Sequence, residues 1–310
     1  MAKEFVIIVD AASDLQEELR ARYDIRIVAS HITLPDRSEI EVTNRWEAFT
    51  RDEFYAELKK NPDGFQTAPG NAAAFKAAFG EAVSAGKGVL AISISTGISG
   101  TYSFMQQAKK ELLQEQPDAE IEICDSLRFS VGFGVLAIHA SKLRAAGKSL
   151  QETYAEIEAI KNTVHQAGWL DDLSFVAKKG RLTHAKAFFG SIAGVKPIGE
   201  FDYNGLTTVI AKARGAKQAY SALLHYMEKT GVDLDKQDIL IAQTNRLPQA
   251  EEYKRLIEER FHPASVTIVD IFPPCGVNIG PGLMAAYYFG TPISEGLVTE
   301  RAILDTFLAK

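Results

Sequence analysis

The stretch VLAISISTGISGTY, residues Val89 to Tyr102, is the most informative part of this sequence. Its first residues, Val89 to Ser93, form a short, mostly apolar run of strand length, and a helical pattern follows Tyr102. Between them lies a loop of small and hydroxyl-bearing residues, Ser95 to Thr101. Free N–H groups and the dipole at a helix start favour an anion, and open α/β sheets bind ligands in loops that follow strands. The stretch therefore predicts an anion-binding loop in an α/β fold, with an ordinary capped turn as the alternative.

Length and composition indicate an ordinary globular chain. It has 310 residues, of which 46% are hydrophobic and 24% charged, with a formal net charge of -6. One large domain or two ordinary ones are expected. The acidic balance argues against a nucleic-acid partner, and no apolar run is long enough to cross a bilayer. The start MAKEFVIIVD lacks a signal-peptide layout. We therefore expect a cytoplasmic protein without stable membrane insertion.

The two cysteines, Cys124 and Cys275, carry no recognisable metal or disulfide pattern. Neither lies in a CxxC or Cys/His spacing, so neither a disulfide framework nor a zinc site is implied. We expect no metal and no cofactor.

The first half of the chain alternates strand and helix patterns. Phe5 to Val9 reads as a buried strand, and Glu120 to Cys124 as a later one. Ser149 and Glu152 form a capping box that opens a helix expected to reach Gln166. The alternation predicts an N-terminal α/β domain, residues 1–167, with a mostly parallel sheet and helices on both faces.

The second half mixes helices with a hairpin. Leu173 to Ala177 reads as a strand and Ala185 to Ala193 as a helix. Val195 to Ala213 reads as a hairpin with a type I′ turn at Asn204-Gly205. This pattern predicts a C-terminal α+β domain, residues 168–310, with a mixed or antiparallel sheet.

Motifs for catalysis are missing from the sequence. The chain has no GxxxxGK[ST], no GxSxG and no HExxH. Cys275 beside Gly276 has the form of a nucleophile, but spacing pairs no histidine with it, and a small buried thiol is the ordinary interpretation.

Two further segments are open to more than one interpretation. Pro273 to Gly282 is a rigid loop that could bring backbone close to a ligand, and a tight turn is the alternative. The basic residues Lys178, Lys179 and Arg181 form a solvated turn, with docking of an acidic partner surface as the alternative.

Short segments spread over nearly the whole chain resemble the motifs of the DegV family. Each is weak alone, but the ordered set is specific. They are Asp10 to Leu15 (its DSTSDL box), Thr67-Ala68-Pro69 (its Thr-Ser-x-Pro segment), Ser95 to Tyr102 (its SxxLSGTY signature), Asp125-Ser126 (its DS strand end), Lys179 to Leu182 (its KGGRI turn), Lys196-Pro197, Arg214-Gly215 and Gly280-Pro281-Gly282.

The resemblance implies two α/β domains that clasp one long-chain fatty acid, with its carboxylate near the domain interface. It further implies a binding subunit of a bacterial fatty acid kinase, whose separate kinase subunit phosphorylates the bound carboxylate for phospholipid synthesis. Ser99 and the Gly100 N–H would hold one carboxylate oxygen, supported by Thr67 and Ser95. The full set of expected ligand-binding residues is Thr67, Ser95, Ser99, Gly100, Thr101, Arg214, Asn278 and Gly280.

The physical interpretation of the residues agrees with that expectation. A fatty acid needs a large apolar cavity with a few placed donors, because a buried carboxylate without partners is costly. Apolar side chains available to line a tunnel include Phe104, Phe129, Phe188, Phe189 and Ile192.

The sequence departs from the family pattern at the expected carboxylate site. Asn278 stands where the family often has a histidine, and an asparagine donates a hydrogen bond but carries no charge. Ala11 and Ala12 stand where hydroxyl residues are usual, and Gly70 replaces a usual serine. A change of ligand is left open by these differences.

We therefore expect a lipid-binding protein with no catalytic residues of its own. Its expected partners are a long-chain fatty acid and a fatty acid kinase subunit. One alternative is an acyl-ester hydrolase or transferase that uses Cys275 or Ser99 as nucleophile. The other is a protein that binds a different small acid.

Overall fold

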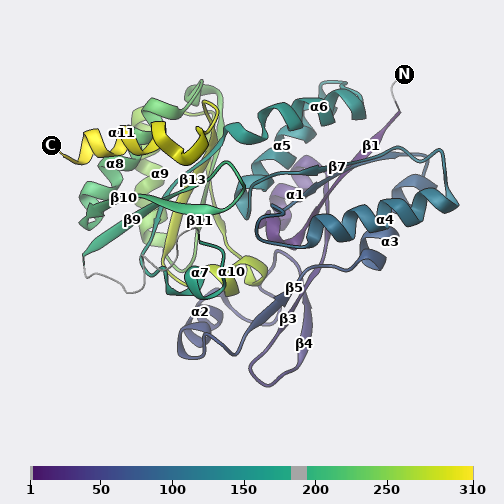
Figure 1. Ribbon diagram of the computed structural model, residues 1–310, viewed down its shortest axis with the longest axis horizontal. Helices are drawn as coiled ribbons and strands as arrows, with labels where there is room; N and C mark the ends of the chain where they lie inside the picture. Colours follow the sequence, from purple (N-terminus) through teal and green to yellow (C-terminus); the bar gives the residue numbers. More distant parts are fainter. Residues whose placement is uncertain (1–2, 183–193, 310) are drawn as a thin grey trace.

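A computed structural model describes residues 3–182 and 194–309 of the chain. The expected helix Ala185 to Ala193 lies outside these residues. The described strands form three sheets of four, six and three strands, shown with their helices in Figure 1. In this part of the chain no helix combines the length and the apolar character needed to cross a membrane.

The four-stranded sheet is wholly parallel and is covered by helices on both faces. Along its strand β1, Phe5, Ile7 and Val9 pack into one hydrophobic cluster, while Val6 and Ile8 pack into another. This alternation confirms the predicted parallel sheet between two helical layers. The strands, in spatial order, are β2 (Ile25–Val28), β1 (Phe5–Asp10), β6 (Gly88–Ser93) and β7 (Ile121–Asp125). One face carries α3 (Ala72–Ser84) and α4 (Thr101–Glu115), and the other α1 (Glu17–Tyr23), α5 (Val131–Ala145) and α6 (Leu150–Ile160).

The six-stranded sheet is mixed, as predicted for the second half. Only its edge pair β11–β12 is parallel, and the other neighbouring pairs are antiparallel. In spatial order its strands are β10 (Thr207–Arg214), β9 (Val195–Phe201), β8 (Val164–Leu170), β13 (Leu283–Phe289), β11 (Asp238–Gln243) and β12 (Ser265–Asp270). The helices packed on it from the second half are α8 (Gly215–Thr230), α9 (Leu247–Phe261) and α11 (Val298–Leu308).

A small antiparallel sheet and the helix α10 (Pro273–Ile279) link the two ends of the sequence. The sheet consists of β4 (Glu39–Val42), β3 (Ser30–Thr33) and β5 (Gln66–Ala68), and α10 packs against β3, β5 and α2 (Arg51–Lys60). The segment that leads into α10 is tied to the first half by two buried hydrogen bonds. The Phe272 N–H donates to the Asp14 carboxyl at 2.8 Å, and the Tyr55 hydroxyl donates to the Ile271 carbonyl at 2.7 Å.

The helix α5 is buried between the parallel sheet and the mixed sheet. It packs against β1 and β6 on one side and against β8 and β13 on the other. Two glycines permit this close approach. A Cβ at Gly132 would lie 2.6 Å from the Phe201 ring, and a Cβ at Gly134 would lie 2.9 Å from the Ser13 carbonyl oxygen and from Leu15.

The predicted helix from Ser149 to Gln166 is wrong in its last part. The capping box is present, but α6 ends at Ile160, and Val164–Leu170 forms the fully buried strand β8. The periodicity of a short apolar run does not show whether the run forms a buried strand or part of a helix. Here the run forms a strand because it pairs with β13 and β9. The predicted domain boundary between residues 167 and 168 falls inside this strand, and the two-domain division stays a prediction.

Three other local predictions are corrected. Leu173 to Ala177 is not a strand, because Ser174–Lys178 forms the helix α7. The Asp172 carboxylate accepts from the Ser174 N–H at 2.8 Å. The hairpin of β9 and β10 is confirmed, but its turn is not type I′, which needs positive φ at both central residues. Gly205 has a φ of 78°, whereas Asn204 has no positive φ and is held by the Asp202 carboxylate. Pro273 to Gly282 is mostly helix, since prolines fit the first turn of α10.

We expect Gly134→Ala to destabilise the protein although alanine favours helix. The added Cβ would overpack α5 against the Ser13 backbone, which lowers the free energy of unfolding by about 1 to 3 kcal/mol. Gly80→Ala in α3 is the matched control, because the nearest atom to its Cβ would be at 3.8 Å. That control should raise the free energy of unfolding by up to about 1 kcal/mol. Urea denaturation of both variants measures the difference, and equal changes in the two would contradict the packing argument.

Candidate functional site

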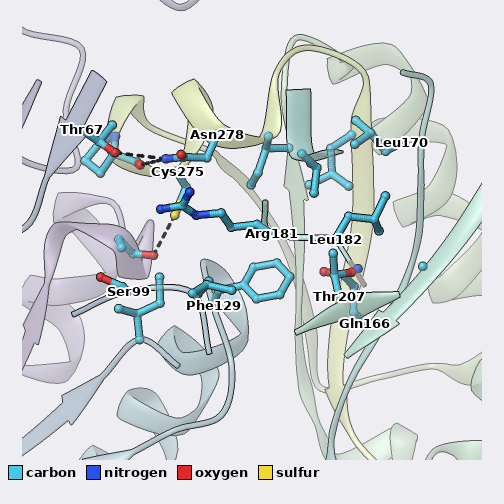
Figure 2. A pocket seen from close by; sticks show the side chains of 18 of the residues that line it. Thr67, Ser99, Phe129, Gln166, Leu170, Arg181, Leu182, Thr207, Cys275 and Asn278 are labelled. Atoms are coloured by element: carbon cyan, nitrogen blue, oxygen red, sulfur yellow. Dashed lines mark hydrogen bonds between the residues drawn. The ribbon is translucent and has the colours of Figure 1, made fainter. Parts of the chain in front are cut away.

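A cavity of about 560 Å³ lies between the first half of the chain and the mixed sheet. Its walls come from the loops after β1 and β6, from β5 and α10, and from β8, α7, β9 and β10. The volume is in the range of small-molecule sites. Its lining is rich in aromatic and aliphatic side chains, and Figure 2 shows Phe129 in the middle of the cavity. These apolar residues are Ile98, Phe129, Trp169, Leu170, Leu173, Val176, Leu182, Val209, Ile279 and Leu283.

Polar groups gather at one end of the cavity, where Figure 2 shows Thr67, Asn278 and Ser99. This end is called the head end below. The Asn278 Nδ2 group donates to the Thr67 Oγ1 at 3.2 Å and to the Pro274 carbonyl at 3.1 Å. The Ser99 and Thr101 hydroxyl oxygens lie 2.8 Å apart. Gly100 precedes the first turn of α4, where the Thr101 N–H donates to the Ser99 Oγ at 3.3 Å and the Ser103 N–H donates to the Gly100 carbonyl at 3.0 Å. The N–H groups of Gly100 and Tyr102 have no partner among the residues that the structure describes.

The loop that carries Ser99 is held in shape by its neighbours. The Asp125 carboxylate, at the end of β7, accepts from the Thr96 N–H at 3.2 Å and from the Thr96 hydroxyl at 2.6 Å. The Ser95 Oγ accepts from the Gly97 N–H at 3.0 Å. The hairpin turn of the mixed sheet presses on the same loop, since a Cβ at Gly205 would lie 2.1 Å from the Ser95 Oγ.

The structure brings together five of the eight predicted ligand-binding residues. Thr67, Ser99, Gly100, Thr101 and Asn278 line the cavity.

The other three predicted residues lie outside the cavity lining. Ser95 is fully buried and shapes the loop beneath it. Gly280 follows α10 with a φ of 77° and packs against Phe175. Arg214 is exposed at the start of α8. Contact of any of the eight with a ligand stays a prediction.

Of the apolar residues expected to line a tunnel, Phe129 does so. Phe104 packs instead against the cluster formed with α3 and α4. The remaining three, Phe188, Phe189 and Ile192, are outside the described residues.

Arg181 lines the cavity, whereas the sequence predicts that it lies in a solvated turn. Its side chain extends from beside Leu182 toward the head end in Figure 2. The Nη1 of its guanidinium group donates to the Lys179 carbonyl. The cation therefore reaches the region of Thr67, Ser99 and Asn278 from the opposite wall, which the turn-like pattern of Lys179 to Leu182 did not indicate.

Two buried carboxyl groups and a thiol lie at the head end, where Asp10 and Cys275 line the cavity and Asp14 lies beside Cys275. Burial raises the pKa of Asp10 to about 7 and that of Asp14 to about 8. The Asp10 Oδ1 accepts from the Ala12 N–H at 2.7 Å, and its Oδ2 has no partner among the residues that the structure describes. The Cys275 Sγ donates to the Ala12 carbonyl at 3.3 Å, and burial raises the pKa of this thiol well above its usual value.

These surroundings disfavour the nucleophile alternatives. A thiol with a raised pKa is not a thiolate at neutral pH, so Cys275 lacks the form that attacks an acyl ester. The Ser99 hydroxyl is bonded to the Thr101 hydroxyl, which is not a general base. Within residues 3–182 and 194–309, no group of three or more His, Cys, Asp or Glu side chains is arranged to hold a metal ion.

Comparison with known proteins finds one family over almost the full chain. A family model described as an uncharacterised protein of the DegV family matches residues 4–291. A DegV domain-containing protein of Clostridium perfringens is 30% identical over 290 residues, which cover 93% of this chain and 98% of the relative.

Solved structures share the fold at lower identity. A DegV family protein from Thermus thermophilus, described for its fatty acid binding, has a TM-score of 0.81 at 22% identity and covers 93% of this chain and 99% of its own. A DegV family protein from Ruminococcus gnavus, described with vaccenic acid, has a TM-score of 0.80 at 21% identity. The match covers 91% of this chain and 99% of that protein's chain.

We expect the free energy of unfolding to fall as the pH rises from about 4 to 8. In this range the folded protein keeps protons on Asp10 and Asp14 that the unfolded chain, with carboxyl pKa values near 3.8, has released. Each such carboxyl contributes a slope of up to about 1.4 kcal/mol per pH unit. Asp14→Asn removes one contribution, and asparagine tolerates the positive φ of 51° at this position.

Urea denaturation between pH 5 and 8 measures how the free energy of unfolding changes with pH in the wild type, in Asp14→Asn and in a control variant. Asp233→Asn is the matched control, because Asp233 is exposed and has a φ of 49°. The slope should be shallower in Asp14→Asn and unchanged in the control. An unchanged slope in Asp14→Asn would show that this carboxyl is ionised in the folded protein.

Proposed function

Because this chain belongs to the DegV family, we propose that it binds one long-chain fatty acid in the cavity. The observation that carries the proposal is the cavity itself, which has an apolar middle and hydroxyl and backbone N–H donors at the head end. The relatives from Thermus thermophilus and Ruminococcus gnavus are described with fatty acids and share the fold. The acyl chain lies along the apolar middle, and the carboxylate lies at the head end.

The hydrogen bonds at the head end leave two hydroxyl protons for the carboxylate. The Ser99 and Thr101 hydroxyls together carry two protons and use one in their mutual bond. The Thr67 Oγ1 accepts from Asn278, so its own proton is free to donate. Both Nδ2 protons of Asn278 are used, on Thr67 and on the Pro274 carbonyl. Asn278 therefore orients Thr67 and makes no direct bond from Nδ2 to the ligand.

Arg181 supplies the positive charge that the head end otherwise lacks. Transfer of a carboxylate out of water is costly unless the charge is paired and hydrogen-bonded. The guanidinium reaches the head end from the mixed-sheet side, while the hydroxyl donors approach from the first half of the chain. In this proposal the carboxylate bridges the two walls of the cavity.

The protein presents the bound acid to a separate fatty acid kinase subunit. Support comes from the exposure of the head end, where Thr67, Ser99 and Asn278 are half-buried and Gly100 is exposed. A carboxylate held there is accessible to a partner that transfers the γ-phosphoryl group of ATP to a carboxylate oxygen. The products of that step are an acyl phosphate and ADP.

We expect the combined substitution Ser99→Ala and Thr67→Ala to remove most of the bound lipid. Hydrogen bonds to a charged group each contribute about 1.5–3 kcal/mol, so losing one or both lowers affinity by roughly 10-fold to over 100-fold. Mass spectrometry of an organic extract measures fatty acid per protein. The wild type should carry nearly one equivalent, and Thr33→Ala, on the strand β3 beside β5, is the control that should keep it.

Two outcomes of that extraction would contradict the proposal. Equal lipid in the wild type and the double variant would refute the site at the head end. A wild-type extract without fatty acid, even after incubation with a range of fatty acids, would refute fatty acid binding.

Presentation to a kinase has its own test. Protein loaded with hexadecanoic acid is incubated with ATP and a bacterial fatty acid kinase subunit, and hydroxylamine traps any acyl phosphate as a hydroxamate. We expect hydroxamate from the wild type and much less from the Ser99→Ala and Thr67→Ala double variant at matched protein concentration. Hydroxamate formed equally without this protein would exclude the presenting role.

A further inference from the structure

The end of the cavity opposite the head end is polar, although an alkyl chain needs no polar partner there. Figure 2 shows Gln166 and Thr207 together at this end, far from Thr67 and Ser99. Gly199 lies between them on the cavity wall. A Cβ at Gly199 would be 3.6 Å from both the Gln166 Nε2 and the Thr207 Oγ1. The two polar groups therefore flank a gap that the missing side chain leaves open.

Gln166 has a donor group without a partner. Its Oε1 accepts from the Tyr287 hydroxyl at 3.0 Å, which directs Nε2 to the other side. The side chain belongs to a residue only 5% exposed, and Nε2 has no hydrogen-bond partner within the described part of the chain. The Thr207 hydroxyl donates to the Glu200 carbonyl at 3.4 Å, so its lone pairs can still accept. A donor and an acceptor thus face the same gap.

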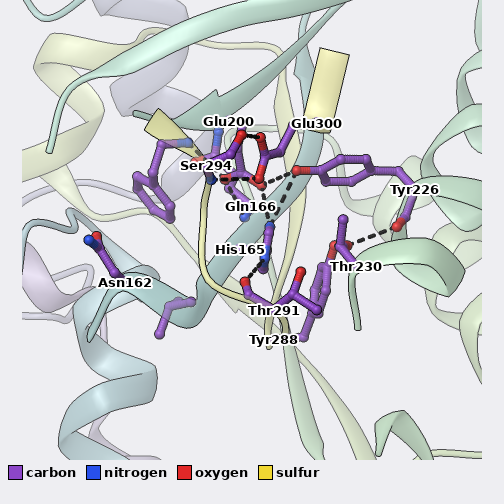
Figure 3. Close-up of polar contacts among 12 residues, drawn as sticks. Asn162, His165, Gln166, Glu200, Tyr226, Thr230, Tyr288, Thr291, Ser294 and Glu300 are labelled. Carbon is purple, nitrogen blue, oxygen red and sulfur yellow. Dashed lines mark hydrogen bonds and ion pairs between the residues drawn. The ribbon is translucent and has the colours of Figure 1, made fainter. Parts of the chain in front are cut away.

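A buried network holds Gln166 in place from behind, as Figure 3 shows. The Glu200 carboxylate accepts from the Gln166 N–H at 2.8 Å and from the Tyr226 hydroxyl at 2.8 Å, and it lies 2.9 Å from the His165 Nδ1. The other ring nitrogen of His165 lies 2.7 Å from the Thr291 carbonyl oxygen. These groups satisfy one another and leave the Gln166 amide as the polar group that reaches the cavity.

The charges near this end favour a neutral ligand group. The Glu200 carboxylate lies directly behind Gln166 and repels a second anion. The buried cation Arg128 donates to the Val164 carbonyl at 2.9 Å and to the Leu127 carbonyl at 2.7 Å, and its guanidinium lies over the Phe201 ring. It is therefore engaged with the protein. The gap suits a neutral group that both accepts and donates.

We infer that the preferred ligand is a long-chain fatty acid with a hydroxyl group on the distal half of its chain, an inference that rests on the proposed function. The hydroxyl oxygen accepts from the Gln166 Nε2 and donates to the Thr207 Oγ1. A plain alkyl chain in the same place leaves the buried N–H without a partner, which costs about 1–3 kcal/mol. The polar end therefore selects for an oxygenated chain.

A displacement assay with a fluorescent fatty acid tests the inference on the full-length protein. The competitors are hexadecanoic acid and its 10-, 12-, 14- and 16-hydroxy derivatives. We expect at least one hydroxy isomer to bind the wild type about 10-fold more tightly than hexadecanoic acid. Thr207→Val, which nearly keeps the shape of the side chain, and Gln166→Leu should bring that ratio close to one. Ser99→Ala is the control, because it weakens all these acids alike and leaves the ratio unchanged.

The outcomes separate this inference from the proposed function. If hexadecanoic acid binds the wild type as tightly as every hydroxy isomer, the hydroxyl site is refuted while fatty acid binding stands. A preference that Thr207→Val leaves intact refutes the assigned residues. If no acid displaces the probe, the proposed function fails and the inference fails with it. Thr207→Val decides the matter even if Gln166→Leu, which leaves the Tyr287 hydroxyl unpaired, does not fold.

Discussion

The packing of α5 between the parallel sheet and the mixed sheet is the constraint on which the cavity depends. The helix is buried on nearly every side, which is the expected environment for a helix that is apolar all round. Its glycines let Phe201 of the mixed sheet and the Ser13 backbone of the first half approach closely. Because the cavity walls come from both sheets, the thickness of this helix sets the distance between the head-end donors and the strands that face them. Protein interiors are close-packed, so that distance has little freedom.

The two ends of the cavity differ in charge and in exposure to water. At the head end the donors Thr67 and Ser99 are half-buried, and Arg181 brings a cation, so a charged group stays close to water. At the other end the polar groups are neutral, and the carboxylate of Glu200 is fully bonded within the protein. In the proposed function the acid therefore binds in one orientation, since the reverse orientation would place its carboxylate beside Glu200, where the nearby cation Arg128 is already bonded to backbone carbonyls.

Much of the fold was predictable because its signals are local. The strand β6, the loop at Ser99 and the start of α4 follow one another in sequence, and capping boxes mark two helices. The strand β8 was not predictable, because its buried run is ambiguous until β13 and β9 pair with it. For the same reason the sequence does not indicate that Gln166 lines the cavity, because its position reads as the end of a helix. Arg181 was missed for another reason, since nothing in a basic turn indicates that its side chain crosses to the opposite wall.

The packing of α10 against β3, β5 and α2 of the first half of the chain affects the order in which the protein folds during synthesis. The hydrogen bonds that anchor this region join residues 211, 216 and 258 positions apart, and one of them, Asn278 to Thr67, orients a head-end donor. Contacts between such distant residues form slowly, because a long loop must close first. As the ribosome adds residues in order, the Thr67 hydroxyl lacks its bond to Asn278 until 211 further residues have been synthesised. We therefore expect the head end of a nascent chain to form only after Asn278 has left the ribosome.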